Sequence, residues 1–365
     1  MRILIAPDKF KGSLGAAEVG SCIAAGIGRA LPMAEIETVA IADGGEGTAE
    51  AICLAGDGEW IICAVHDALG QPFDARYVWL PETQLAAVEM SAAAGLAQLL
   101  PDERNPLEAS TFGVGEMLLA ASARGAREII LGLGGSATND GGFGLARCLG
   151  FRFLANDDRE LTGPVSDLLD LARIDSPNEF SLSRLIAACD VTNPLLGPNG
   201  ATRTFGAQKG ATPEQIEILE RSLARLADVA ALTFGRDHRE EPGAGAAGGL
   251  GYGLLTFCGA TIRSGFEVVA DLIDLRKRIA RADIVITGEG KLDHQTLAGK
   301  GPAGVARMAR AEGKRVFAIV GQASDDAAAR ELFDQVMTLD DASTNYRETA
   351  QLLESRAHAL ATGWS

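Results

Sequence analysis

The chain has 365 residues, of which 47% are hydrophobic and 22% are charged, and its formal net charge is −16. This length predicts two domains of a globular protein, because a typical domain has about 100–200 residues. The excess of acidic residues argues against nucleic acid and against an anionic membrane as partners, because both require clustered lysine and arginine. A small phosphate-bearing ligand stays compatible with the negative net charge, because salt screens charge beyond about 8–10 Å.

The cysteines, the histidines and the N-terminal residues predict where the protein works. Six cysteines are scattered without a C-x-x-C pair, and four histidines show no ligand spacing, so we expect buried reduced thiols and no zinc site. Met1 and Arg2 lead directly into an apolar strand, without a signal sequence or a membrane-spanning run. We therefore expect a cytoplasmic protein.

Apolar strands and amphipathic helices alternate along the first part of the chain, which is typical of an α/β fold. We expect a strand at 2–6, a helix at 14–31 that ends at a proline, and a second strand at 35–43. Three strand-like runs then fill residues 59–90 and are joined by the turn signals DALGQP and PET. This pattern predicts an antiparallel meander rather than a βαβ unit.

The second part of the chain contains short, fully apolar strands followed by polar turns. We expect them at residues 127–133, 183–190, 282–288 and 314–321. A long helix is predicted from Thr212, because Thr212 and Gln215 fit a capping box and Pro213 suits the first helical position. Together with the first part, this order predicts an α/β protein.

The strongest candidate for a ligand-binding loop is GLGGSATNDGGFG, residues 132–144, between a predicted strand and a predicted helix. Glycines let backbone N–H groups approach an anion closely, and the start of a helix adds a favourable dipole. The predicted cofactor-binding residues of this loop are Gly134, Gly135, Ser136, Thr138 and Asn139, and Asp140 supplies a candidate metal-binding carboxylate. The alternative is a tight glycine-rich turn that holds no ligand.

Residues 132–137 also fit the dinucleotide pattern G-x-G-x-x-A, with Asp157 and Asp158 about where a ribose-binding acid would stand. This match keeps open an NAD-dependent oxidoreductase of 2-hydroxy acids. A non-catalytic protein that binds a phosphorylated sugar acid is a further alternative. The P-loop pattern G-x-x-x-x-G-K-[ST] does not occur in the sequence, which excludes a P-loop kinase.

Three more polar loops follow expected strands. In ADGGEGT (42–48), Asp43 and Glu46 offer oxygen ligands for Mg²⁺ or for positioning a hydroxyl group. In residues 189–211, Asp190 closes a buried strand and Lys209 follows in a polar stretch. For each loop the alternative is a solvated turn or surface charge.

The last of these loops, residues 287–306, crowds charged side chains between a strand and a helix. They are Glu289, Lys291, Asp293 and Lys300. Four loops that combine carboxylates, lysines and glycines favour a site for phosphate and a metal ion, with charge arranged around a transferred phosphoryl group.

Eight segments occur in a characteristic order along the chain. They are APDKFKGSL, ADGGEGT, VEMSAAAGL, GLGGSATNDGG, CDVTNPLLGPNGA, FGAQKGA, GAGAAGGLG and TGEGKLDHQTLAGKGP. Together they resemble the bacterial glycerate kinase family (class I, glycerate 2-kinase-like), from residue 3 to about 340. The resemblance implies phosphorylation of D-glycerate that depends on ATP and Mg²⁺. It favours 2-phosphoglycerate as the product over 3-phosphoglycerate, and D-glycerate as the partner, with a homodimer as a further expectation.

The resemblance also implies two α/β domains, one with a Rossmann-like parallel sheet and one with a mixed sheet, and an active site in the cleft between them. We place the first domain at residues 1–58 plus 270–365 and the second at 59–269.

The departures from the family pattern are small. Lys9 stands where many members have serine, His294 replaces a small polar residue, and Ala207 replaces a common proline, so Lys9 and His294 are poor catalytic candidates. Asp190 is the preferred catalytic carboxylate, with Lys11, Asp43 and Asp293 as further catalytic candidates. Lys209 and Lys300 join the predicted cofactor-binding residues; the predicted metal ligands are Asp140, Glu289 and Glu46. Lys11, with Ser13 behind it, is expected to hold either the glycerate carboxylate or a phosphate of ATP.

Overall fold

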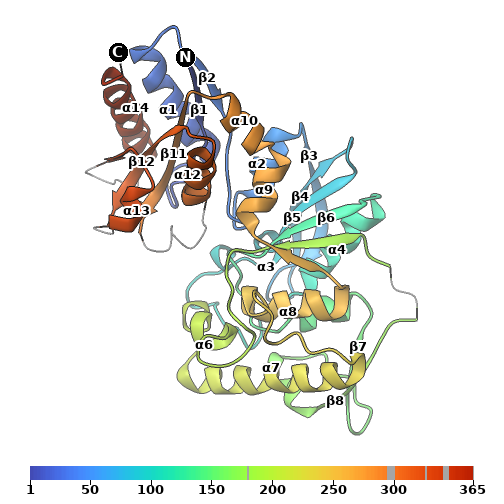
Figure 1. Cartoon of the computed structure of the whole chain (residues 1–365). Helices are drawn as coiled ribbons and strands as arrows, with labels where there is room; N and C mark the ends of the chain where they lie inside the picture. Colours follow the sequence, from blue (N-terminus) through green and yellow to red (C-terminus); the bar gives the residue numbers. More distant parts are fainter. Residues whose placement is uncertain (179–180, 294–300, 325–326, 340–344, 365) are drawn as a thin grey trace. The chain divides into compact units, whose positions relative to one another are not determined.

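The computed structural model describes residues 1–365 except 179–180, 294–300, 325–326, 340–344 and 365. The chain divides into two compact units, which are described separately. Unit 1 consists of Met1–Asp43, Glu50–Asp57 and Gly265–Ser365, and unit 2 consists of Gly44–Ala49 and Gly58–Ser264. Both units combine helices with a sheet (Figure 1), which confirms the predicted α/β class.

Unit 1 is built on a five-stranded parallel sheet in the order β13-β12-β11-β1-β2. The strands are β1 (Arg2–Ile5), β2 (Glu35–Thr38), β11 (Ile284–Leu292), β12 (Arg315–Ala323) and β13 (Gln335–Thr338). In the register, Ile3 lies opposite Ile36 on one side and Ile284 on the other. A strand inside such a sheet is buried on both faces, which explains why its sequence is continuously apolar.

Helices cover both faces of this sheet, as expected for a Rossmann-like unit. They are α1 (Ala16–Ala30), α2 (Thr48–Ala55), α9 (Gly265–Leu272), α10 (Leu275–Arg281), α12 (Gly301–Ala311), α13 (Ala327–Glu331) and α14 (Tyr346–Thr362). Ile3 and Ile5 pack with α1 and α14, which lie side by side in Figure 1. Leu4 and Ala6 point to the other face and pack with α9, α10 and α12. The two-residue alternation of β1 therefore serves two cores.

Unit 2 contains a six-stranded mixed sheet in the order β10-β9-β6-β5-β4-β3. The strands are β3 (Glu59–His66), β4 (Pro72–Leu80), β5 (Leu85–Glu89), β6 (Glu128–Gly132), β9 (Arg184–Ala188) and β10 (Thr261–Arg263). The pairs β3–β4 and β4–β5 are antiparallel, which confirms the meander predicted for residues 59–90. The other neighbours are parallel, so β5, β6, β9 and β10 end at the same edge.

The remaining elements of unit 2 surround this sheet. They are α3 (Ser91–Ala94), η1 (Leu96–Gln98), α4 (Phe112–Ala123), α5 (Phe143–Cys148), η2 (Val165–Asp170), α6 (Ala201–Phe205), η3 (Ala207–Lys209), α7 (Pro213–Phe234) and α8 (Ala246–Cys258). The predicted capping box at the start of α7 is present, with the Thr212 side chain accepting from the N–H of Gln215. None of the helices in the part that the structure describes is long and apolar enough to cross a membrane.

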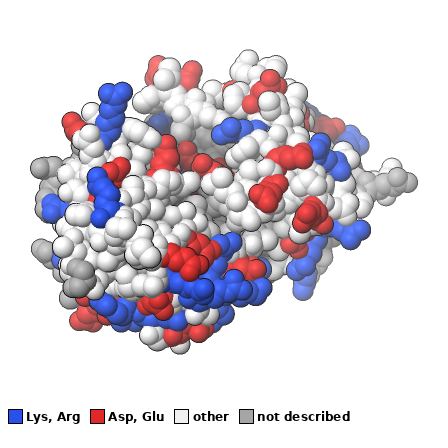
Figure 2. Space-filling view, turned by 90° about the horizontal axis from the view of Figure 1, so that it is seen from above, with Lys and Arg blue, Asp and Glu red and all other residues white. Residues whose placement is uncertain are grey.

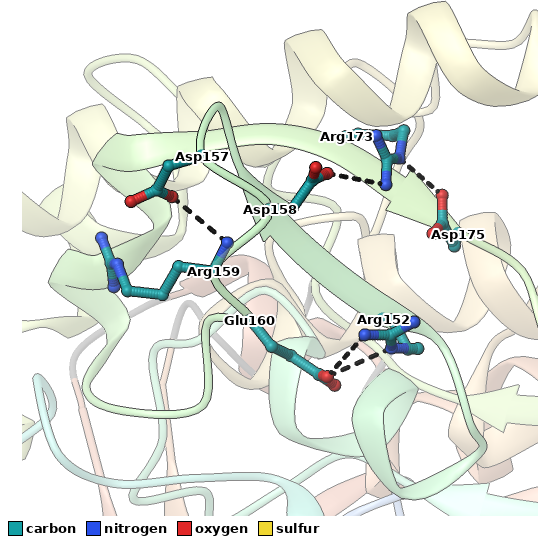
Figure 3. A network of polar contacts seen from close by, with 7 residues as sticks. All are labelled: Arg152, Asp157, Asp158, Arg159, Glu160, Arg173 and Asp175. Atoms are coloured by element: carbon teal, nitrogen blue, oxygen red, sulfur yellow. Dashed lines mark hydrogen bonds and ion pairs between the residues drawn. The ribbon is translucent and has the colours of Figure 1, made fainter.

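A separate antiparallel hairpin, β7 (Arg152–Ala155) and β8 (Leu171–Asp175), packs beside α7. Figure 3 shows its network of ion pairs, in which Arg173 contacts Asp158 and Asp175, and Arg152 contacts Glu160. These side chains are exposed, so solvent screening leaves these ion pairs little influence on stability. On the molecular face shown in Figure 2, acidic and basic side chains likewise lie next to one another.

The cysteines are all free, as expected for reduced thiols. Only Cys189 is buried, and the other five are half-buried, so the expectation of buried thiols holds for one of them. Burial raises the pKa of Cys148 and of Cys258 to about 12, so these two thiols stay protonated near neutral pH.

Candidate functional site

A cavity of about 400 Å³ lies at the carboxyl ends of the parallel strands of unit 1. Segments that follow or end β1, β11 and β12 line it, including Asp8–Lys11, Glu289–Lys291 and Gly321–Gln322. The chain runs outward from β1 to β2 on one side of the sheet and from β11 to β12 on the other. Ligands of open α/β sheets bind at such a switch in strand order.

Both signs of charge line this cavity. Its charged residues are Asp8, Lys9, Lys11, Asp43, Glu289 and Lys291. The structure thus brings together three residues that the sequence predicts for the site: Lys11, Asp43 and Glu289. Asp8 accepts the backbone N–H of Lys9 at 2.7 Å, which fixes the direction of its carboxylate.

Ser13 also lines the cavity, and its Oγ is buried without a hydrogen-bond partner among the described residues. A buried hydroxyl normally has a partner, so this atom marks Ser13 as a candidate for a ligand contact. Asp293 directly follows β11, and its carboxylate pairs with the ammonium group of Lys291 at 3.3 Å. Lys300 and His294 lie outside the described residues.

A second cavity of about 270 Å³ lies at the opposite, amino end of the same sheet. Ion pairs of Arg2 with Glu35 and of Arg278 with Glu37 flank it. None of the residues predicted for the site lines it.

The carboxyl edge of the parallel strands in unit 2 carries a second set of polar groups. Asp190 follows β9, and its Oδ1 accepts a hydrogen bond of 2.7 Å from the hydroxyl of Ser264, which follows the neighbouring strand β10. The carboxylate of Asp190 is half-buried. Ser264 therefore orients the preferred catalytic carboxylate; the sequence reasoning missed it, although it directly follows a short strand.

Glu89, the last residue of β5, holds the segment that contains Glu46. Its Oε1 accepts the backbone N–H groups of Gly47 and Ala49, each at 2.9 Å. A carboxylate at the start of α2 is favourable, because helix N-termini expose N–H groups and a positive dipole end. The sequence reasoning quoted VEM as part of the resemblance but assigned Glu89 no role.

The glycines of the predicted phosphate loop are needed for close packing between two loops. A Cβ on Gly134 would lie 2.4 Å from the Cα of Gly45, and a Cβ on Gly132 would lie 2.7 Å from the carbonyl oxygen of Gly44. The N–H of Gly134 donates to the same carbonyl at 3.3 Å. Backbone contact between the segments 132–135 and 44–47 thus requires residues without a side chain.

Asp140 is buried within its own loop, with 1% of its surface exposed. Its Oδ2 accepts from the N–H and the hydroxyl of Thr111 and from the N–H of Gly144, and its Oδ1 accepts from the N–H of Gly142. Burial raises the pKa of Asp140, and these hydrogen bonds oppose the rise. The carboxylate thus occupies the N-terminus of α5, where the sequence predicts that an anion binds. Metal binding by Asp140 stays a prediction, and it would require the metal ion to replace some of these hydrogen bonds.

Three other residues predicted to bind the cofactor have internal partners. Asn139 donates from Nδ2 to Thr202 at 2.9 Å, and Thr138 donates to the carbonyl of Ala247 at 3.4 Å. Lys209 donates from Nζ to Ser136 Oγ at 2.7 Å and to the carbonyl of Thr138 at 2.6 Å. Burial lowers the pKa of Lys209 to about 7, and nearby Asp140 opposes this shift. Ligand contact by Thr138, Asn139 and Lys209 stays a prediction.

Comparisons with known proteins decide the family. The sequence model of the glycerate kinase family matches residues 3–365. The chain belongs to the glycerate kinase family. It is therefore an enzyme of a kinase family, and kinases of this kind use a nucleoside triphosphate as phosphoryl donor.

Individual members of the glycerate kinase family resemble the chain over most of its length. Glycerate kinase from Bacillus subtilis is 43% identical over 332 residues, which covers 90% of this chain and 87% of that protein. Glycerate 2-kinase from Escherichia coli K12 is 41% identical over 331 residues, covering 89% and 86%. A crystal structure of a Salmonella typhimurium LT2 protein named glycerate kinase 2 has a TM-score of 0.89 and 39% identity, and it covers 100% of this chain and 98% of that one.

Membership of a kinase family removes the support for the NAD-dependent alternative, and the structure gives the physical reason. The helix N-terminus that would receive the pyrophosphate in a dinucleotide fold is occupied by Asp140. Asp157 and Asp158, the candidates for the ribose-binding acid, lie in the loop of the β7–β8 hairpin, where Asp158 pairs with Arg173 (Figure 3).

Proposed function

We propose that this member of the glycerate kinase family transfers the γ-phosphoryl group of ATP to the 2-hydroxyl of D-glycerate, with Mg²⁺, and releases 2-phosphoglycerate and ADP. The observation that carries the proposal is the charged cavity of unit 1, where Lys11, Asp43 and Glu289 meet at the switch point of a parallel sheet. The name of the Escherichia coli relative, glycerate 2-kinase, supports the 2-hydroxyl as acceptor.

The anionic groups of the substrates are assigned to the basic part of the cavity. Lys11 and the unpartnered hydroxyl of Ser13 would hold either a phosphate of ATP or the glycerate carboxylate. Lysines concentrate positive charge where negative charge develops during phosphoryl transfer. Lys300 stays a candidate for a phosphate contact.

The carboxylates of the site fit Mg²⁺, which prefers oxygen ligands and keeps several of its waters. Among the described residues, no three His, Cys, Asp or Glu side chains converge closely enough to hold a metal ion by themselves. We therefore propose that Glu289, with Glu46 and Asp140 as further candidates, binds a Mg²⁺ that is also held by substrate phosphates. Bound in this way, the ion would neutralise charge on the phosphoryl group.

Asp190 is proposed as the group that accepts the proton of the substrate hydroxyl. The hydrogen bond from Ser264 to Oδ1 fixes the carboxylate at the end of β9, at the carboxyl edge of the parallel strands of unit 2 where ligands of such sheets bind. Positioned general bases typically accelerate a reaction by about 10²–10⁴-fold. Asp43 and Asp293 stay alternative candidates for this role.

The proposed function is tested by coupling ADP release to NADH oxidation in the presence of ATP, Mg²⁺ and D-glycerate. We expect turnover with D-glycerate, little with L-glycerate, and background ATPase without an acceptor. Direct addition of enolase should convert the product further, because enolase accepts 2-phosphoglycerate. A requirement for added phosphoglycerate mutase would identify 3-phosphoglycerate and overturn the 2-hydroxyl assignment, and absence of ADP release would overturn the kinase proposal.

A further inference from the structure

We propose that Lys209 is a positioning residue that orients the hydroxyl proton of Ser136, so that Ser136 donates a hydrogen bond to an anionic substrate group at the end of β6. This inference rests on the proposed function, because it requires a substrate that carries phosphate or carboxylate. It differs from the expectation that Lys209 itself touches the phosphate.

The burial of Lys209 excludes direct contact with a ligand in the described conformation. The residue is 2% exposed at the end of η3, and its ammonium group donates to Ser136 Oγ and to the carbonyl of Thr138. The next residue, Gly210, has φ 95°, and a Cβ there would lie 2.5 Å from the carbonyl oxygen of Arg104. The backbone around Lys209 is therefore fixed by close packing.

The chemistry of the two groups fixes the direction of their hydrogen bond. A protonated lysine has three donors and no acceptor, whereas a serine hydroxyl has one donor and can accept two bonds. When Lys209 is protonated, Ser136 Oγ must therefore accept from its ammonium group, and the proton of Ser136 points to another partner. Among the described residues, Ser136 Oγ has no second partner.

The backbone holds Ser136 at the accessible part of the loop. The carbonyl of Gly135 accepts from the N–H of Leu96 at 2.8 Å, and the N–H of Ala137 donates to Ala94 at 2.9 Å, so the chain is anchored on both sides of Ser136. Gly135 is exposed, and Ser136 keeps 8% of its surface exposed.

Ser136 is also the most accessible polar side chain of this part of the loop. Thr138 and Asn139 are 0% exposed and Asp140 is 1% exposed. Ser136 is therefore the residue of the segment 136–140 with the most exposed surface, and we assign its hydroxyl as the side-chain donor to the ligand. In the protonated state of Lys209, the ammonium group buried behind Ser136 makes this hydroxyl a donor toward the ligand, which suits an anion and not a cation.

The test combines four variants: Ser136→Ala, Lys209→Met, the double variant, and Ser136→Thr, which keeps the hydroxyl. We expect Ser136→Ala and Lys209→Met each to raise the KM of one and the same substrate, ATP or D-glycerate, by roughly tenfold, because one hydrogen bond to a charged group is lost. The value of kcat should change less than KM. The KM of the double variant should not exceed the higher of the two single-variant KM values, because both changes remove the same donor. Ser136→Thr keeps the hydroxyl and should have a KM near that of the parent.

Ser222→Ala is the matched control, because Ser222 is a buried serine of α7 in the same unit, and its Oγ has no hydrogen-bond partner in the part of the chain that the structure describes. Its KM values should equal those of the parent protein. Multiplicative effects in the double variant, or an unchanged KM in Ser136→Ala, would overturn the proposal. If Lys209→Met does not fold, the comparison of Ser136→Ala with Ser136→Thr decides: equal KM values in these two variants would refute the role of the hydroxyl.

Calorimetric titration with ATP and, separately, with D-glycerate separates this inference from the proposed function. If the parent protein shows no turnover, the proposed function fails. Weaker binding of one of these two anions by Ser136→Ala, but not by Ser136→Thr, would still support the inference. Equal binding of both anions by all the variants would refute it.

Discussion

Replacing Lys209 by methionine should change the pH dependence of stability in a defined direction. Burial lowers the pKa of this lysine from 10.5 to about 7, so between these two pH values the unfolded chain binds more protons than the folded chain. The free energy of unfolding of the parent protein must therefore rise with pH across this interval. Methionine has a similar length and no titrating group, so Lys209→Met should lose this contribution.

The magnitude follows from the size of the shift. One pKa unit corresponds to about 1.4 kcal/mol, so the slope approaches ~1.4 kcal/mol per pH unit above the folded pKa. Between pH 7 and 9, the difference in unfolding free energy between the parent and Lys209→Met should grow by about 2 kcal/mol in favour of the parent. All other titrating groups are common to both proteins and largely cancel in this difference.

Guanidinium unfolding followed by tryptophan fluorescence can measure this difference. Trp60 and Trp79 lie in unit 2 with Lys209, and Trp364 lies in unit 1 against Phe317. In a Trp364→Phe background the fluorescence therefore reports unit 2 alone. A difference between the two proteins that stays constant from pH 7 to 9 would refute the reasoning, because it would mean that Lys209 has the same pKa in the folded and the unfolded chain.

Three further predictions follow from the contacts described above. Asp140→Asn removes acceptor capacity from a buried carboxylate with four hydrogen bonds, so it should lower the free energy of unfolding of unit 2 by about 2–4 kcal/mol. A loss below about 0.5 kcal/mol in denaturant titration would contradict the role of Asp140 in holding this loop. Gly134→Ala should destabilise the protein by more than about 1 kcal/mol, because the added Cβ would meet the Cα of Gly45. Gly28→Ala in α1 is the control and should be neutral or stabilising. Equal melting temperatures for these two variants would refute the packing of Gly134 against Gly45. Asp190→Asn should lower kcat by about 10²–10⁴-fold with little change in Mg²⁺ dependence, and Ser264→Ala should lower it less; an increased Mg²⁺ requirement would instead identify Asp190 as a metal ligand.

Most strands of both sheets could be predicted from the sequence because their apolar runs are local signals, but β13, a four-residue edge strand, was not predicted. The run at 282–288 marks β11, although the strand extends to Leu292 into the polar loop. The hairpin β7–β8 was not predicted, because its two strands are short and separated by 15 residues that include η2. The short strand β10 was missed for a similar reason, since three residues carry too little pattern.

The candidate site could be predicted only in part. Lys11, Asp43 and Glu289 meet because each follows or ends a parallel strand, and the sequence shows strand ends directly. The burial of Lys209 depends on Ser136, which is 73 residues away, and no local pattern in a polar stretch such as AQKG reports such a contact. The sequence pattern singles out the glycines of residues 132–135 for ligand binding, and that role stays a prediction. The structure shows that Gly132 and Gly134 are needed for loop packing, which depends on the position of Gly44 and Gly45.

The most direct test of the proposed reaction is phosphorus NMR of the product formed from ATP and D-glycerate, recorded for the parent protein and for Lys11→Met. Lys9→Met serves as the matched control, because Lys9 lines the same cavity but is a poor catalytic candidate. We predict stoichiometric ADP and a resonance that matches added 2-phosphoglycerate, with the rate strongly reduced in Lys11→Met and largely kept in Lys9→Met. A resonance that matches 3-phosphoglycerate would contradict the assigned hydroxyl. Equal rates for the parent and Lys11→Met would contradict the assignment of the unit 1 cavity as the site of phosphoryl transfer.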